Sequence, residues 1–178
     1  DTPGVYGVGS FNDEERVARD IVLGADLLLN VVSASTLERD LFLTLQLLDT
    51  GLPLVVALNQ MDEAGRHGVQ IDVQVLAERL GVPVVPCVAI HGEGMDAMKA
   101  ALPDARVGRQ DAGLLALLAD LPVAVGGSDA PTRSERLLLL EGDDVVAHRF
   151  GLPPGSQREA VFAARRERVD ALVALVVR

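Results

Sequence analysis

Two polar residues at the end of one apolar run have the spacing to recognise a purine base. The run LVVAL, residues 54–58, leads directly into Asn59, and Asp62 follows three positions later. Open α/β sheets bind ligands at the carboxyl ends of their strands. There Asp62 can accept hydrogen bonds from the adjacent N1–H and N2 amine of guanine, whereas adenine presents an acceptor at N1. The spacing favours a guanine site in which Asn59 braces neighbouring loops, and by itself it equally fits a loop cap or turn.

Two further motifs occur in the order that a nucleotide switch needs. The chain begins DTPG, where the carboxylate of Asp1 can hold Mg²⁺ through water and the amide of Gly4 can reach a terminal phosphate. Downstream, in VAIHGEG, a backbone amide among Ala89, Ile90 and His91 can contact the guanine oxygen. Each motif is weak alone. Because all three lie at or near expected strand ends in this order, together they predict one nucleotide site.

The elements that must position these motifs are short strands alternating with helices. Apolar runs predict strands at 26–32, 54–58 and 84–88, and this alternation is typical of βαβ units with a parallel sheet. Such strands are expected to be covered on both faces. Helices are predicted at 13–23, from Leu37 to Gly51, at 73–80 and at 95–102.

The character of the chain changes after Pro103. No strand run of the same kind follows, and residues 114–121, 133–140, 143–150 and 157–177 have helical patterns, with 137–140 alternatively a short strand. The sequence therefore predicts an α/β domain over 1–105 and a small all-helical domain over 106–178.

Local signals add expectations about helix starts and surfaces. Ser35 with Glu38, and Ser156 with Glu159, have capping-box spacing. The cluster of arginines and one glutamate at 165–168 is expected to be a solvated helix face.

Composition limits the class of protein. The chain has 178 residues, 26 acidic against 16 basic side chains and a net charge of −10, which argues against a nucleic-acid partner because phosphate binding needs a basic face. The single cysteine, Cys87, is expected to be a buried apolar residue in a reducing compartment. No apolar segment approaches the length of about 20 residues that a membrane span needs, so the chain is expected to be soluble.

Longer stretches of the chain resemble one family. DTPGVYGVGSFNDEERVARD, DLLLNVVSASTLERDLFLTLQLLDTGLPLVVALNQMDEAG and VPVVPCVAIHGEGMDAMK are similar to the intracellular GTPase domain of the ferrous iron transport protein B family, over residues 1 to about 102. The resemblance implies a P-loop GTPase-like parallel sheet with flanking helices, incomplete at its N-terminus, followed by a helical domain that links the GTPase to a membrane-embedded iron pore. It implies GTP or GDP with Mg²⁺, with Mg²⁺ held by Asp1 through water, and nucleotide contacts at Asp1, Gly4, Asn59, Gln60, Asp62, Ala89, Ile90 and His91.

The chain departs from the pattern of such GTPases in three places. The phosphate loop, Gly-x-x-x-x-Gly-Lys-Ser/Thr, occurs nowhere in these residues and is expected upstream of Asp1. Val5 stands where many GTPases carry a glutamine that orients the attacking water, so hydrolysis is expected to be slow. No catalytic residue is assigned, and the isolated chain is expected to be inactive. Gln60 replaces the usual lysine and can still cover the base with its stem.

Two function classes remain open. The first is the guanine-nucleotide-binding regulatory region of a prokaryotic Fe²⁺ transporter, at the cytoplasmic face of the cell membrane. Nucleotide state would then gate a pore of the same polypeptide downstream of Arg178, and in this setting the arginines at 165–168 could contact lipid head groups. The second is a nucleotide-incompetent regulatory or interaction module on the same fold. A phosphate loop in the parent protein favours the first, and a homo-oligomer is compatible with both.

Overall fold

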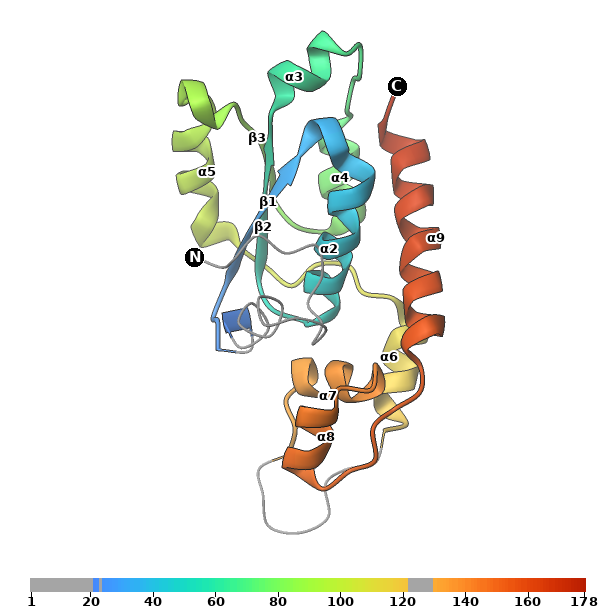
Figure 1. The fold of residues 1–178 in the computed structure, drawn as a ribbon. Helices are drawn as coiled ribbons and strands as arrows, with labels where there is room; N and C mark the ends of the chain where they lie inside the picture. The colour runs from blue at the N-terminus through green and yellow to red at the C-terminus, as the bar shows by residue number, and fades with distance from the viewer. Residues whose placement is uncertain (1–20, 23, 122–129) are drawn as a thin grey trace.

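The sheet expected from the sequence is present and parallel. The computed structural model describes residues 21–22, 24–121 and 130–178 (Figure 1). Within them the strands are β1 (Leu28–Ser33), β2 (Leu54–Asn59) and β3 (Val84–Pro86), paired in parallel in the order β1-β2-β3. The register places Ser33 beside Asn59, so β1 and β2 end at the same level. The parallel sheet is confirmed, although β1 begins two residues later and β3 ends two residues earlier than expected.

The two long strands differ in how they are covered. β2 is buried from Leu54 to Leu58, as a continuous apolar run predicts for a central parallel strand. Burial alternates along β1. Val32 is buried, whereas Leu29 is 42% exposed and Val31 is 62% exposed. The expectation of cover on both faces is therefore wrong for β1, which is an edge strand among the described residues.

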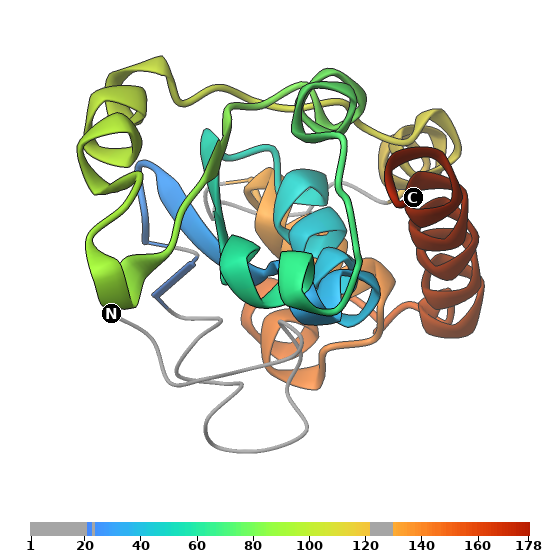
Figure 2. The same ribbon diagram turned by 90° about the horizontal axis from the view of Figure 1, so that it is seen from above.

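Helices flank the sheet in layers. α5 (Met95–Ala101) lies on one side of the sheet, and α2 (Leu37–Asp49) and α4 (Val73–Leu80) lie on the other (Figure 1 and Figure 2). α9 (Arg158–Val176) runs along the outside of α2 and α4 as a further layer. Its residues Val169 and Val176 are fully buried in the core that the sheet and α2 share. The helix nearest the C-terminus thus packs directly on the α/β part of the molecule.

The described chain after residue 105 is helical. Its other helices are α6 (Ala112–Ala119), α7 (Arg133–Leu140) and α8 (Asp144–Phe150), which form a cluster at one end of the molecule (Figure 1). Residues 137–140 belong to a helix, so the alternative of a short strand there is wrong. The division of the chain between residues 105 and 106 stays a prediction. The remaining elements are η1 (Ala34–Thr36), α3 (Met61–Arg66), η2 (Ala89–His91) and η3 (Leu102–Asp104).

The capping box expected at the start of α2 does not form. A 3-10 turn, η1, comes between β1 and α2, and no side chain caps either element. The hydroxyl of Ser35 instead bonds the hydroxyl of Ser33 at 2.8 Å, and Glu38 forms an ion pair with Arg166 of α9. Ser35 and Glu38 therefore contact β1 and α9 instead of capping α2, and their sequence spacing does not reveal these contacts.

The second expected capping box is also wrong. α9 begins after Gln157 without a side-chain cap, so Ser156 and Glu159 do not form the predicted pair. A capping box is present at α7, where the side chain of Thr132 accepts a hydrogen bond from the amide of Glu135 and the Glu135 carboxylate accepts one from the Thr132 amide. This pair satisfies two amides that have no partner within the helix.

A buried ion cluster joins α2 to α9. Asp49 at the end of α2 is fully buried, and its carboxylate accepts hydrogen bonds from Arg165 Nε at 2.8 Å and Arg168 Nη1 at 3.3 Å. Arg165 Nη2 also lies 2.7 Å from Glu141 Oε1, and Arg133 Nε donates to the Asp49 carbonyl oxygen at 3.0 Å. The expectation of a solvated arginine face is therefore wrong for Arg165, whose side chain is 4% exposed.

Two other expectations concern the chain ends and the membrane. The helix expected at 13–23 lies almost wholly outside the described residues. In the described part of the chain, no helix combines the length and apolarity needed to cross a bilayer.

Candidate functional site

Asn59 connects the end of β2 to the turn that follows β3. Its side-chain oxygen accepts a hydrogen bond from the amide of Ala89 at 3.0 Å and lies 3.8 Å from the sulfur of Cys87. Ala89 and Cys87 come about 30 positions after Asn59 in the chain. They lie beside it because parallel strands end at the same edge of the sheet. Asn59 thus holds the Asn-x-x-Asp motif and the Ala89–His91 turn together. This is the bracing role expected of it.

The turn after β3 is closed by its own backbone. Val88 and Glu93 exchange hydrogen bonds at 3.0 and 3.2 Å. Gly94, with φ of 77°, completes the turn, and a Cβ there would lie 2.4 Å from the carbonyl oxygen of Pro86, so only glycine fits. At the tip Ile90 is 83% exposed, and its amide donates to no acceptor among the described residues. The turn therefore presents a fixed backbone donor at the sheet edge.

Asp62 lies at the start of α3, directly beyond the strand end. Its carboxylate Oδ2 accepts a hydrogen bond from Arg66 Nη2 at 2.6 Å, one helical turn later. This hydrogen bond lowers the pKa of Asp62 below its ordinary value of 3.8, against a smaller opposing effect of desolvation. Asp62 is therefore an acceptor at neutral pH, and its guanidinium partner occupies a position that a ligand with N–H donors would take.

Gln60 separates these two polar residues and has an unusual backbone. Its φ is 61°, and it is the one non-glycine residue with positive φ in the described part of the chain. Its side-chain oxygen accepts a hydrogen bond from the hydroxyl of Ser33 at the end of β1. Ser33 and Arg66 were not among the residues expected at the site. The strand register that pairs Ser33 with Asn59 would have indicated Ser33. The i,i+4 spacing from Asp62 on a helix would have indicated Arg66.

The remaining site predictions have mixed outcomes. Asp1, Gly4 and Val5 lie outside the described residues, so the Mg²⁺ position assigned to Asp1 stays a prediction. The described residues contain no group of three or more His, Cys, Asp or Glu side chains placed to hold a metal ion. Cys87 is buried, as expected, and burial raises the pKa of its thiol.

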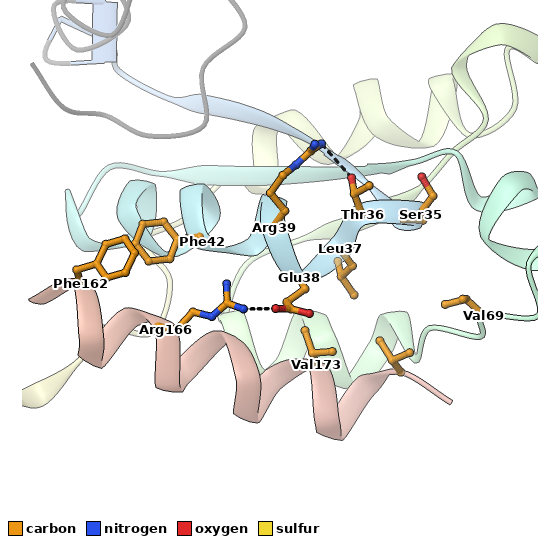
Figure 3. A pocket seen from close by; sticks show the side chains of 12 residues that line it. Ser35, Thr36, Leu37, Glu38, Arg39, Phe42, Val69, Phe162, Arg166 and Val173 are labelled. Atoms are coloured by element: carbon orange, nitrogen blue, oxygen red, sulfur yellow. Dashed lines mark hydrogen bonds and ion pairs between the residues drawn. The ribbon is translucent and has the colours of Figure 1, made fainter. Parts of the chain in front are cut away.

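A groove of about 610 Å³ lies between α2 and α9 and extends to η1, the turn that directly follows the carboxyl end of β1 (Figure 3). The rings of Phe42 and Phe162 meet there with centroids 4.7 Å apart, and Arg166 pairs with Glu38. None of the residues predicted to bind nucleotide lines this groove. Its charged pair is internally satisfied, so the groove is better explained as a seam between two packed helices than as the base site.

The proteins that resemble this chain in sequence include Fe(2+) transporters. A family model described as Ferrous iron transport protein B matches residues 1–102. The Fe(2+) transporter FeoB of Escherichia coli strain K12 is 37% identical over 185 aligned positions, which cover 96% of this chain and 24% of the transporter. FeoB of Salmonella typhimurium strain LT2 is 48% identical over 108 positions, 57% of this chain and 14% of that protein. The chain spans about a quarter or less of these relatives.

Solved structures agree with this match over the whole chain. The cytosolic domain of L. pneumophila FeoB superposes with a TM-score of 0.82 at 29% identity, covering 100% of this chain and 79% of that one. A GDP-bound variant of the S. thermophilus FeoB G-domain gives 0.85 at 30% identity, covering 100% and 80%. The T. maritima FeoB cytosolic domain in its GMPPNP form gives 0.81 at 26% identity, covering 100% and 79%. By sequence and by fold, this chain belongs to the ferrous iron transport protein B family.

Proposed function

We propose that this chain is the guanine-nucleotide-binding regulatory region of an Fe²⁺ transporter. The observation that carries the proposal is the hydrogen bond from the Ala89 amide to Asn59. It unites at one sheet edge the two motifs that would read the base. FeoB structures in GDP and GMPPNP forms share this fold and support a nucleotide ligand.

Each group at this edge would have a distinct role toward guanine. The Asp62 carboxylate accepts from N1–H and the N2 amine, and the amide of Ile90 donates to the guanine oxygen, within a turn that Ala89 and His91 complete. Gln60 covers one side of the base. Because Arg66 occupies Asp62 Oδ2 in the described state, guanine binding displaces or shares this hydrogen bond. Binding is therefore selective for guanine over adenine, which lacks the matching donors.

The phosphates require groups that the described residues do not supply. In this proposal Asp1 holds Mg²⁺ through water and Gly4 meets the terminal phosphate, while a phosphate loop is contributed from upstream of Asp1. Hydrolysis is slow because Val5 cannot orient water. The membrane pore belongs to the same polypeptide beyond Arg178, and the region lies on the cytoplasmic face of the membrane.

The packing of α2 against α9 supports a route from nucleotide to pore. α2 follows the end of β1 directly through η1, and its opposite end carries Asp49, which is held by Arg165 and Arg168 of α9. The end of α9 returns to the α/β part, where the amide of Arg178 donates to the carbonyl oxygen of Gln70 at 2.9 Å. A shift of α2 would therefore move α9, the last helix before the proposed pore.

Calorimetric titration tests the proposed ligand. The protein to use is the natural polypeptide, including any residues that precede Asp1, with the 178-residue chain beside it. In the presence of Mg²⁺ we expect the natural polypeptide to bind GDP and GTP at least about 10³-fold more tightly than ADP. The 178-residue chain should bind far more weakly, because it contains no phosphate-loop sequence. Equal affinity for GDP and ADP, or no binding of either, would contradict the proposal and favour an interaction module.

A further inference from the structure

We infer that Ser33 is a positioning residue that fixes Gln60 as a hydrogen-bond donor toward the nucleotide. The inference rests on the proposed guanine-nucleotide site and assigns one more residue to it. Ser33 is the last residue of β1, and its Cα is the register partner of Asn59 on β2. It therefore lies at the same sheet edge as the base-reading motif, one strand away.

The backbone of Ser33 is held independently of any ligand. Its amide donates to Asp40 Oδ2 at 2.9 Å, and Asp40 in turn accepts from Arg39 Nε at 2.9 Å. The amide belongs to the strand end and the carboxylate to the first turn of α2, so two elements fix this position. The backbone position from which the Ser33 hydroxyl projects is thus fixed before any ligand binds.

With Gln60 Oε1 facing Ser33, the protons in this cluster have one consistent order. Gln60 Oε1 carries no hydrogen, so the Ser33 hydroxyl must donate to it across 2.5 Å. The single Ser33 proton is then used, and Ser35 must donate to Ser33 Oγ across 2.8 Å. Gln60 Nε2, with two N–H donors, bonds no acceptor in the described part of the chain. Gln60 therefore keeps both Nε2 donors available to a ligand.

The backbone of Gln60 has a left-handed conformation, which is energetically unfavourable for a residue other than glycine. Such conformations persist where surrounding contacts hold them. The next residues form α3, so the left-handed turn separates the direction of Asn59, which faces the Ala89 turn, from that of Gln60, which faces β1. The Ser33 bond is the side-chain contact that anchors Gln60 on that side.

A side chain with two free N–H donors between Asn59 and Asp62 is matched to acceptors on a bound nucleotide. A nucleoside diphosphate offers such acceptors on its base, its sugar and its phosphates. A lysine would present the same polarity, because an ammonium group has donors and no acceptor. By holding Oε1 on the β1 side, Ser33 therefore lets a neutral glutamine direct its Nε2 donors toward a ligand, where a lysine would present a cation.

Nucleotide affinity in single and double variants tests this role. We measure GDP and GTP dissociation constants of the natural polypeptide, with thermal midpoints alongside. Ser33→Ala should weaken both nucleotides by the same factor, about three- to tenfold, as expected for one neutral hydrogen bond. Ser33→Thr keeps the hydroxyl and should bind within about twofold of the unmodified protein. Gln60→Glu keeps an acceptor for Ser33 but replaces the free donor with an acceptor, so it should weaken binding at least as much as Ser33→Ala.

Two controls separate positioning from general structure. Ser35→Ala removes the neighbouring hydroxyl but leaves the Ser33 proton for Gln60, so affinity should stay within about twofold. In a Gln60→Gly background, Ser33→Ala should have no further effect, because its target is gone. The inference is overturned if Ser33→Ala binds as tightly as the unmodified protein, if Ser35→Ala is equally damaging, or if Ser33→Ala still weakens binding without Gln60. Failure of the unmodified protein to bind GDP would instead overturn the proposed function, and this inference with it.

Discussion

Replacing Asp49 by alanine is expected to lower the free energy of unfolding by about 3–5 kcal/mol, since breaking a buried ion pair leaves an uncompensated charge. Arg165, with a side chain 4% exposed, would retain only Glu141 as a partner. For a chain of this size the loss corresponds to a fall in Tm of roughly 6–20 °C, measured by calorimetry or circular dichroism. The large effect follows from burial, because the Asp49 carboxylate is fully enclosed.

A matched control distinguishes burial from charge. Asp170 pairs with Arg166 on the surface of α9 at 3.4 Å, and both side chains are about half exposed. Asp170→Ala removes the same charge and should leave the Tm almost unchanged, because exposed ion pairs contribute little. Equal shifts for Asp49→Ala and Asp170→Ala would show that the buried cluster does not hold α2 and α9 together.

Replacing Asp62 by asparagine is expected to change the base preference of the natural polypeptide from guanine to xanthine. Asparagine has one acceptor and one donor where aspartate has two acceptors, so its amide would oppose the N2 amine of guanine. GDP affinity should fall by about 10²- to 10⁴-fold. Xanthosine diphosphate carries an oxygen at that position and should bind the variant more tightly than GDP does. Competition against a fluorescent nucleotide measures both constants.

The control for this exchange is an acidic residue in the helical cluster. Asp144 is exposed in the first turn of α8, and Asp144→Asn makes the same change of net charge. It should leave GDP and xanthosine diphosphate affinities unchanged. If Asp62→Asn also leaves the preference for guanine intact, Asp62 does not read the base.

The sheet edge was predictable because the relevant signals are local. An apolar run that ends in Asn59 marks a buried strand, and parallel strands must end at one edge, so the Ala89 turn had to lie nearby. The exposed face of β1 was less predictable. Leu29 and Val31 have the same apolar character as the buried residues of β2, and composition alone does not show which strand lies at the edge.

The buried cluster at Asp49 could not be read from the sequence. Asp49 and Arg165 are 116 positions apart, and no periodic pattern links them. Arg165 lies in a run of charged residues, which usually indicates a solvated face, yet one helix presents Arg165 inward and the half-exposed Arg166 outward. The capping box expected at the start of α2 failed for a similar reason, since Ser35 and Glu38 have partners in β1 and α9.

The edge formed by Asn59, Asp62 and the Ala89–His91 turn is the proposed position of the guanine base. The most direct test is a GDP titration of the isotope-labelled natural polypeptide, followed through its backbone amide resonances. The proposed base position predicts that the Ile90 and Asp62 amides shift most within the described residues, and that ADP at the same concentration leaves them in place. Shifts centred instead on Phe42 and Phe162 of the α2–α9 groove, or equal responses to ADP and GDP, would contradict it.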